Sequence, residues 1–436
     1  MRLAVVELCV AALCLAAGAF AQQKPNVVVF LTDDMGYADT GPFGAKDIRT
    51  PHIDRLAREG VRLTNSYSNG PVCTPTRAGL MTGRYQQRVG LEWALVPADK
   101  GKGLPESETT IARMLKGNGY ATAIFGKWHL GGEPEFNPRV HGFDKFFGIT
   151  GGNTDMYSHE NRFGTHDLWE DTEKVGKTGY LTEMLADRAV EWIGEHSREP
   201  FFLYVPFNAV HWPFQAAGRP NDVRNPQTWY DGTRPKDYAP MLEAMDAAVG
   251  RVLAALDKHG LAQNTLVIFT NDNGGERLSD NRPLFHHKAT LWEGGIRVPS
   301  IVRFPGRLPA GKVSNQVTMT MDFAASILAA TGVEAPADRK LDGVNVLPVL
   351  SGKQAPVERT LFWRIDRGDR KQKAVRQGNW KYLRDGAIEM LFDLDRDVSE
   401  RADISFRHPE KLAALRNAMR EWEEELQRTP PTFVVK

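Results

Sequence analysis

Short hydrophobic runs alternate along the chain with longer segments of helical periodicity. Four runs have the apolar, β-branched and aromatic composition of buried strands: Asn26–Leu31, Ala121–Phe125, Phe201–Val205 and Leu266–Thr270. The spacing of apolar residues predicts helices between them: Ile53–Glu59, Thr110–Leu115, Leu181–Ile193 and Met241–His259. Strands that alternate with helices predict an α/β fold, in which a large, mainly parallel sheet is sandwiched by helices.

The pattern changes after about Pro336. Short segments there predict antiparallel strands joined by turns: Leu361–Trp363, Ala374–Arg376, Trp380–Leu383 and Met390–Leu394. His408–Gln427 is predicted to be an amphipathic helix, with apolar residues spaced three and four apart: Leu412, Leu415, Met419, Trp422 and Leu426. We therefore predict a catalytic α/β domain over residues 22–337 and a C-terminal α+β subdomain over residues 338–436, with an antiparallel sheet and a closing helix.

Polar side chains follow each of the four predicted strands of the large sheet. In chain order they are Asp33 and Asp34, then Lys127 and His129, then His211, and finally Asp272 and Asn273. Ligands bind to open α/β sheets at the carboxyl ends of the strands. The pattern therefore predicts one shared site at that edge.

The N-terminus has the features of a cleaved secretory signal. Arg2 precedes an apolar run from Leu3 to Phe20, and small residues end at Ala21, where we expect cleavage. The run is short and contains Glu7, which argues against a membrane anchor. The mature protein is therefore expected to be secreted or periplasmic.

Charge and cysteine content narrow the chemistry. The chain has 55 basic and 54 acidic residues, so its net charge of +1 gives no general electrostatic reason to bind nucleic acid or membranes. Two of its three cysteines, Cys9 and Cys14, lie in the predicted signal peptide. Cys73 is then the only cysteine of the mature chain, and it cannot form an internal disulfide.

The four polar residues of the first and last predicted strands offer oxygen ligands only: Asp33, Asp34, Asp272 and Asn273. Such a set suits a hard cation, calcium or magnesium, whereas zinc prefers histidine or thiolate. A single Asp-Asp pair after a strand is equally well explained by a turn or a helix cap. The matching Asp-Asn pair favours the metal.

Five basic residues are candidates for the same site: Arg77, Lys127, His129, His211 and Lys288. Each of them alone is more simply explained as a surface or packing residue. Together with a divalent cation they would form a positive pocket that suits an anionic oxyester, a phosphate or a sulfate.

Cys73 fits poorly beside such a site if its thiol is retained. A thiol nucleophile would need an activating base, which His129 or His211 could supply. Soft sulfur, however, is a poor ligand for a hard cation. The residue makes better chemical sense if its sulfur is replaced.

Cys73–Arg77 (CTPTR), followed by Leu80–Arg84 (LMTGR), resembles the signature of the type I, formylglycine-dependent sulfatases, which have the alkaline phosphatase fold. Nearly the whole mature chain shares the resemblance. The segments NVVVFLTDDMGYADTG, GYATAIFGKWHLG, NAVHWP, DNG, KATLWEGGIRVP and LFDLDRDVSERADI follow in the family's order.

The resemblance implies that Cys73 is oxidised to formylglycine by a formylglycine-generating or an anaerobic sulfatase-maturating enzyme. The modified residue would bind calcium with the four oxygen ligands, and Arg77, Lys127 and His129 would surround the hydrated aldehyde. One hydroxyl of the hydrate would attack sulfur, and the other would then expel sulfate. His211 and Lys288 would contact the sulfate and the leaving oxygen, and either could be the general acid.

Two other functions compete with a sulfatase. A hydrolase of phosphate or phosphonate esters could share the fold, although relatives with that activity often place histidine beside the aspartate, where this chain has Asn273. A non-catalytic protein that binds sulfated glycans should have lost the nucleophile or metal ligands, all of which are present.

The segments outside the signature predict a sulfated carbohydrate as the substrate. Three segments combine aromatic rings, which stack on sugars, with side chains that bind hydroxyls or further sulfates: Glu92-Trp93, Gly151–His159 leading on to Asn161-Arg162, and Trp363–Arg367. Within them we predict substrate contacts from Asp155, His159 and Arg364. Each segment is equally well explained as an ordinary surface loop.

Overall fold

A computed structural model of the chain describes residues 24–220 and 222–436. The predicted signal peptide, with Cys9 and Cys14, lies outside these residues. Within the described ranges, none of the helices combines the length and apolar character that crossing a bilayer requires.

A ten-stranded sheet forms the centre of the molecule, in the order β11-β2-β10-β9-β1-β8-β4-β5-β6-β7. Its strands are β1 (Asn26–Thr32), β2 (Val61–Leu63), β4 (Ala121–Lys127), β5 (Lys145–Ile149), β6 (Trp169–Glu170), β7 (Glu173–Lys174), β8 (Phe201–Pro206), β9 (Thr265–Asn271), β10 (Ser300–Arg303) and β11 (Lys312–Ser314). All four predicted strands are confirmed, as β1, β4, β8 and β9. They run parallel as neighbours, whereas β10 and β6 are antiparallel to their partners β9 and β5.

Strand β1 lies at the centre of the sheet, between β8 and β9, and every residue of it is buried. Its side chains alternate between two hydrophobic layers: Val27, Val29 and Leu31 belong to one, and Val28 and Phe30 to the other. A strand that is covered on both faces needs an apolar residue at every position, which is why its sequence is a continuous hydrophobic run.

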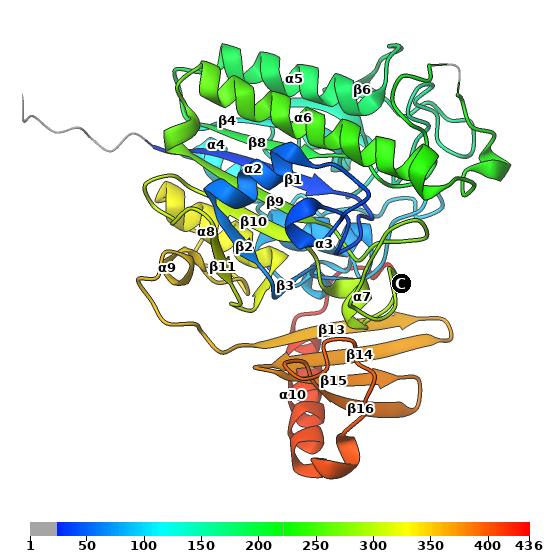
Figure 1. Cartoon of the computed structure of the whole chain (residues 1–436), viewed down its shortest axis with the longest axis vertical. Helices are drawn as coiled ribbons and strands as arrows, with labels where there is room; N and C mark the ends of the chain where they lie inside the picture. The colour runs from blue at the N-terminus through cyan, green and yellow to red at the C-terminus, as the bar shows by residue number, and fades with distance from the viewer. Residues whose placement is uncertain (1–23, 221) are drawn as a thin grey trace, which may run out of the picture.

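Helices cover both faces of the sheet (Figure 1). Those that contribute to one apolar layer are α2 (Pro51–Glu59), α5 (Leu181–Glu195) and α6 (Ala239–Lys258). Those that contribute to the other are α3 (Cys73–Thr82), α4 (Ile111–Gly117) and α8 (Thr320–Thr331). The four predicted helices, α2, α4, α5 and α6, are confirmed to within two residues at each end. The short helices α7 (Glu293–Ile296) and α9 (Leu347–Leu350) lie in connections, and β3 (Ser66–Tyr67) pairs with β12 (Thr318–Met319).

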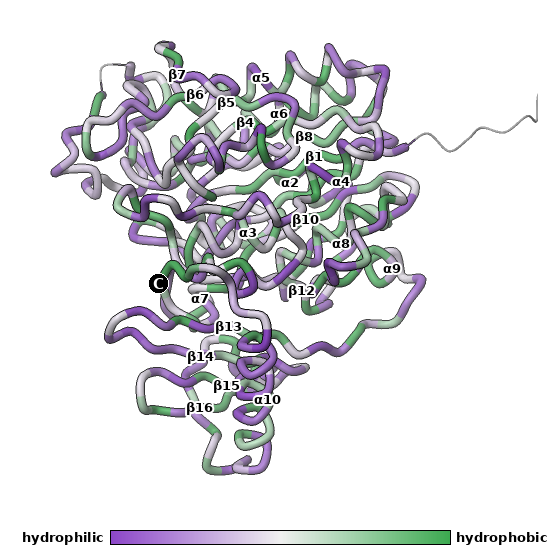
Figure 2. The backbone as a smooth tube through the Cα atoms, turned by 180° about the vertical axis from the view of Figure 1, so that it is seen from behind, coloured by the Kyte–Doolittle hydropathy of each residue, from purple (hydrophilic) through white to green (hydrophobic). Residues whose placement is uncertain are grey.

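The C-terminal part forms a separate antiparallel sheet, as predicted. Its strands are β13 (Thr360–Arg367), β14 (Arg370–Gln377), β15 (Trp380–Asp385) and β16 (Ile388–Asp393), and α10 (Pro409–Arg428) packs against them. Leu415, Met419, Trp422 and Leu426 of α10 are buried, whereas Leu412 is partly buried. Most of the other residues of α10 are hydrophilic, in contrast to the hydrophobic strands of the large sheet (Figure 2). The boundary between residues 337 and 338 stays a prediction.

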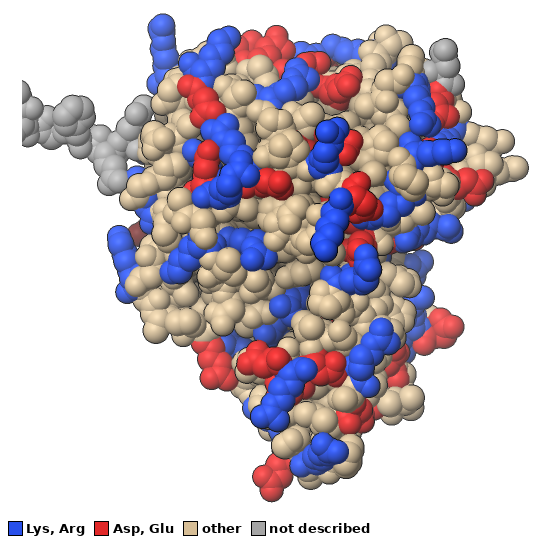
Figure 3. Space-filling model, viewed as in Figure 1, with Lys and Arg blue, Asp and Glu red and all other residues tan. Residues whose placement is uncertain are grey.

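The two sheets share one apolar layer. Trp363 of β13 packs against Tyr67, with ring centroids 5.3 Å apart, and donates a hydrogen bond to the Ser68 carbonyl. The C-terminal tail then returns to the larger part, where the Val435 amide donates to the Gly90 carbonyl at 2.7 Å. On the face shown in Figure 3, basic and acidic side chains are interspersed, as the near-zero net charge leads one to expect.

Candidate active site

The predicted site lies at the carboxyl edge of the parallel strands. Asp33 and Asp34 follow β1, and Asp272 and Asn273 follow β9, which is the neighbour of β1. Lys127 is the last residue of β4. All of these side chains are buried, so their charges interact at low effective dielectric.

Cys73 is the first residue of α3, which points its N-terminus at this edge. Pro75 is tolerated because the first turn of a helix has no intrahelical partner for its backbone N–H groups. Arg77 lies four residues after Cys73, and therefore on the same face of the helix. Its guanidinium donates to the Lys127 carbonyl at 2.7 Å and to Asp272 at 2.9 Å. The spacing of CTPTR is thus explained: it places the cysteine and the arginine in one buried site.

Two lysines neutralise the first pair of carboxylates, and a histidine lies beside them. The Nζ atom of Lys127 lies 2.6 Å from Asp33, and that of Lys288 lies 2.6 Å from Asp34. The Nε2 atom of His211 lies 3.4 Å from the same oxygen of Asp34. Burial alone would raise the pKa of Asp34, but Lys288 and His211 hold it well below its usual range.

Close backbone packing brings the loop that carries Lys288 next to the segment that follows Asp272 and Asn273. The Gly274 amide donates to the Gly295 carbonyl at 2.9 Å, and the Lys288 amide donates to the Gly275 carbonyl at 3.2 Å. A Cβ atom on Gly274 would lie only 1.8 Å from the Gly294 carbonyl oxygen. Only glycine permits this approach.

The carboxylate cluster fits a cation. One ligand atom from each of Asp33, Asp34, Cys73 and His211 lies within 4.8 Å of the others. The Oδ1 atom of Asn273 is buried and has no hydrogen-bond partner, although its Nδ2 atom donates to Asp34 at 2.8 Å. An amide oxygen that is free beside buried carboxylates has the chemistry of a ligand for a hard cation.

Asp272 lies beside this compact group and completes the predicted set. Its Oδ1 atom accepts a hydrogen bond from the Asp34 amide at 3.3 Å. Burial, and then the nearby charge of Asp33, raise the pKa of Asp272 to about 7. The crowding of carboxylates is therefore costly unless further positive charge enters the site.

The thiol of Cys73 is poorly suited to act as a nucleophile. Its Sγ atom lies 3.5 Å from Asp33, and Cys73 is buried. Burial raises the pKa of the thiol well above its usual value, although Lys127 and Lys288 oppose this. The thiolate is the reactive form of cysteine, and burial disfavours it here.

The two histidines of the site have lowered pKa values. Burial and the nearby lysines lower the pKa of His211 to about 3, and burial and Lys127 lower that of His129 well below its usual value. The Nε2 atom of His129 lies 2.9 Å from the Leu95 carbonyl, whereas its Nδ1 atom is buried without a partner. Thr74 completes a closed ring of contacts: its hydroxyl donates to the His129 carbonyl and accepts from the Leu95 amide.

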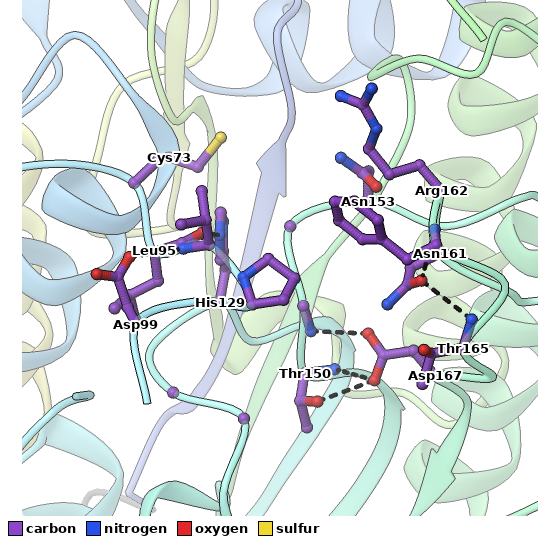
Figure 4. Close-up of a pocket in the computed structure, with 18 of the residues that line it drawn as sticks. Cys73, Leu95, Asp99, His129, Thr150, Asn153, Asn161, Arg162, Thr165 and Asp167 are labelled. Atoms are coloured by element: carbon purple, nitrogen blue, oxygen red, sulfur yellow. Dashed lines mark hydrogen bonds between the residues drawn. The ribbon is translucent and has the colours of Figure 1, made fainter. Parts of the chain in front are cut away.

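A cavity of about 480 Å³ opens above the site. Cys73, His129, His211 and Lys288 contribute to its lining. Figure 4 shows Leu95 and Asp99 on one side of His129, and Asn161 and Arg162 on the other. The remaining wall comes from segments 94–102, 131–133, 150–153 and 161–169, together with Lys174 and Trp212.

The structure does not bring the three predicted substrate contacts to this cavity. The Asp155 carboxylate accepts hydrogen bonds from the Tyr157 and Ser158 amides and from Gln215, so it holds its own loop together. His159 is fully buried, and its Nε2 atom lies 3.2 Å from the Gly179 carbonyl.

Arg364, the third of these residues, binds protein carboxylates. It forms a two-pronged contact with Glu92, at 2.7 and 3.0 Å, and also lies 3.4 Å from Glu423. Glu92 is buried by this contact and does not line the cavity either. The side chains that do line the wall lie close to Asp155 and His159 in the sequence: Asn153 and Arg162, which belong to the predicted polar segment, and His166 and Trp169, which sequence reasoning did not select.

Glu276 and Trp212 are further residues of the site that sequence reasoning missed. The indole of Trp212 donates to Glu276 at 3.1 Å, and Glu276 lies 3.9 Å from Lys288. The available signal was position alone, because Trp212 follows His211 and Glu276 lies three residues after Asn273.

The fold and the site together define an α/β hydrolytic enzyme of the alkaline phosphatase fold. Residues 25–333 match the sulfatase family model, and residues 283–429 match the model described as N-sulphoglucosamine sulphohydrolase, C-terminal. The chain belongs to the sulfatase family and is a sulfuric ester hydrolase.

Individual relatives agree with this assignment. N-acetylgalactosamine-6-sulfatase of Sus scrofa is 33% identical over 91% of this chain and 84% of its own length. The structure of Ps i-CgsB in complex with k-i-k-neocarrahexaose has a TM-score of 0.87 and 31% identity, and covers 95% of both chains. The phosphonate monoester hydrolase of Agrobacterium radiobacter, at 19% identity and a TM-score of 0.64, over 93% of this chain and 96% of its own, shares the fold alone.

Proposed function

We propose that this protein hydrolyses a sulfate monoester of a saccharide, with a formylglycine made from Cys73 and a calcium ion. The observation that carries the proposal is the position of Cys73. It begins a helix at the carboxyl edge of the sheet, lies 3.5 Å from Asp33 and contributes to the lining of the cavity. The same residue therefore reaches both the proposed metal ligands and the substrate.

The Sγ atom of Cys73 stands in for the oxygen atoms of the hydrated aldehyde. The hydrate would supply a hydroxyl nucleophile together with a second hydroxyl that lets the sulfated enzyme release sulfate without attack by water. The unfavourable thiol pKa and the absence of another cysteine in the mature chain support this replacement. Maturation by a formylglycine-generating or anaerobic sulfatase-maturating enzyme, and export of the chain, belong to the same proposal.

The buried basic residues bind and orient the reacting groups in this proposal. Arg77 is fixed by Asp272 and the Lys127 carbonyl, and it holds the modified residue in place. The free Nδ1 atom of His129 accepts a hydrogen bond from a hydroxyl at position 73. His211 and Lys288 both contact Asp34 and both line the cavity, so in this proposal they contact the sulfate and the leaving oxygen.

Asp33, Asp34, Asp272 and Asn273 would hold the metal, and all four offer oxygen, which favours calcium. The free Oδ1 atom of Asn273 and the raised pKa of Asp272 support a cation there. The ion would offset the carboxylate charges and polarise the sulfate oxygens.

The named relatives support a saccharide as the substrate. One is called N-acetylgalactosamine-6-sulfatase, and a solved relative is bound to a neocarrahexaose. The cavity also has the size and mixed aromatic and polar lining that a sugar requires.

Mass spectrometry of the tryptic peptide Leu63–Arg77, followed by turnover of a saccharide sulfate panel, tests the proposal. We expect the formylglycine mass in active preparations and loss of turnover in Cys73→Ala. Full activity with an intact thiol would overturn the mechanism. A matched panel of phosphate and phosphonate monoesters should be turned over far more slowly, and a preference for either would reassign the reaction.

A further inference from the structure

The two sides of the cavity differ in how their cations are paired. On one side, Lys102 lies 3.3 Å from Asp99, and Lys100 lies 3.9 Å from Glu133. On the other side, Arg162 and Lys174 contribute to the lining, and neither forms an ion pair with any carboxylate among the described residues. Two cations without an ion-pair partner in the described part of the chain therefore lie on that second side, while its lining carboxylate, Asp167, accepts hydrogen bonds from Trp169 and Thr150.

Both unpaired cations lie against aromatic rings. The guanidinium of Arg162 lies 5.6 Å from the ring centroid of Phe163, and the Nζ atom of Lys174 lies 5.2 Å from that of Trp169. Phe163 is 67% exposed, so its ring is accessible to a ligand. Aromatic faces beside cations can stack on a sugar ring while the cations bind its anionic substituents.

The protein fixes this side of the cavity in place. The Asn161 side chain accepts hydrogen bonds from the Phe163 and Thr165 amides, at 3.0 and 3.1 Å. The indole of Trp169 donates to Asp167 at 2.7 Å, and Asp167 also accepts from Thr150 at 2.9 Å (Figure 4 shows the Thr150 contact). A preorganised wall loses little conformational entropy when it binds a ligand.

We propose that the substrate carries a second anionic group besides the sulfate that is cleaved, and that Arg162 and Lys174 bind it. This inference rests on the proposed function, because it assigns the far wall of the same cavity. The chemical class is a saccharide sulfate with an additional sulfate ester or carboxylate. Phe163 and Trp169 stack on the sugar that bears this group.

The test compares three saccharides with the same backbone: one with a single sulfate, one with a second sulfate, and one with a carboxylate as its second anionic group. The Arg162→Gln/Lys174→Gln double variant is assayed with each. We expect the KM of at least one doubly charged saccharide to rise about tenfold or more, because charged hydrogen bonds are lost, with little change in kcat. The KM of the monosulfated saccharide should stay within about twofold, because the variant keeps the cleavage site.

Lys100→Gln is the matched control, because Lys100 lines the same cavity but lies beside Glu133. It should leave all KM values nearly unchanged. The wild-type preference for the doubly charged saccharide should also weaken as salt concentration rises.

A wild-type enzyme without any preference for a doubly charged saccharide would overturn this inference. So would a double variant that weakens all three substrates equally. If formylglycine is present and the wild-type enzyme cleaves none of the saccharides, the proposed function itself has failed, which is a different result.

Discussion

The chain buries charged clusters in two places, at the edge of the large sheet and between the two sheets. In the second cluster, the Glu293 carboxylate lies 2.9 Å from Lys381 and 3.2 Å from Arg297, and accepts a hydrogen bond from Tyr67 at 2.6 Å. Burial alone would raise the pKa of Glu293, but these cations lower it to about 2. Burial, and then the nearby charge of Asp33, raise the pKa of Asp272 in the first cluster to about 7, and the pKa of Glu400, beside Glu293 in the second cluster, is likewise raised to about 7.

What separates the functional cluster from the structural one is whether the buried polar atoms have partners within the protein. The protein surrounds Glu293 with its own cations, so this cluster fixes the C-terminal sheet onto the catalytic part. At the sheet edge, carboxylates crowd one another, and Asn273 and His129 each keep a buried polar atom without a partner. Such unsatisfied atoms are costly in a folded protein unless a ligand engages them.

Asp33→Ala tests the cluster at the sheet edge and has the largest expected effect. We expect the loss of stoichiometric calcium and of measurable sulfatase activity, because the variant removes a proposed ligand and the partner of Lys127. Metal analysis and turnover of an aryl sulfate measure the two losses, with circular dichroism as the check on folding. Retention of calcium, or stoichiometric zinc in the wild type, would contradict the assignment of the site.

His211→Ala tests the proton donor within the same cluster. General acid help contributes about 10²–10⁴-fold, and an alkyl alcohol needs it more than a phenol does. If His211 supplies the proton, the rate with an alkyl sulfate should fall by that factor, and the rate with an aryl sulfate much less. Lys288→Met is the matched variant, because Lys288 contacts the same oxygen of Asp34. The general acid is the residue whose variant loses much more rate with the alkyl sulfate than with the aryl sulfate. If each variant loses the same factor with both substrates, neither residue is the general acid.

Lys381→Met tests the structural cluster. It leaves Glu293 and Glu400 buried without the lysine that lies 2.9 and 2.7 Å from them. Breaking a buried ion pair costs about 3–5 kcal/mol, which denaturant unfolding measures. Arg416→Met, which removes an exposed pair with Glu389, is the control and should cost less than about 1 kcal/mol. If the folded Lys381→Met protein keeps normal calcium content and activity, the second cluster has a structural role only. Loss of bound calcium would show that the two clusters are coupled.

Arg364→Met should have the smallest effect. It tests the contact between the C-terminal sheet and the segment of the larger part that contains Glu92. Arg364 holds Glu92, which lies three residues before Leu95, and Leu95 contacts both Thr74 and His129. We expect kcat to fall several-fold for aryl and saccharide sulfates alike, since the variant loosens the support of His129 and removes no substrate contact. Both substrates are assayed side by side. A fall in kcat with saccharide sulfates only would instead indicate that Arg364 contacts the substrate.

The sequence by itself determined the large sheet and the cluster at its edge. Buried parallel strands are continuous apolar runs, and their carboxyl ends meet at one edge, so Asp33, Asp34, Lys127, Asp272 and Asn273 were brought together by the strand pattern alone. The four-residue spacing of Cys73 and Arg77 then placed both on one helical face. These inferences need only local periodicity and one rule of sheet topology.

Only the tertiary structure decided which loop side chains reach the cavity. Asp155 and Arg162 lie in one polar stretch of the sequence, yet Asp155 turns inward to Gln215 and Arg162 lines the cavity. Arg364 likewise pairs with Glu92, a residue 272 positions away. The direction of a loop side chain depends on hydrogen bonds and ion pairs with distant segments, and no local hydrophobic pattern records those partners.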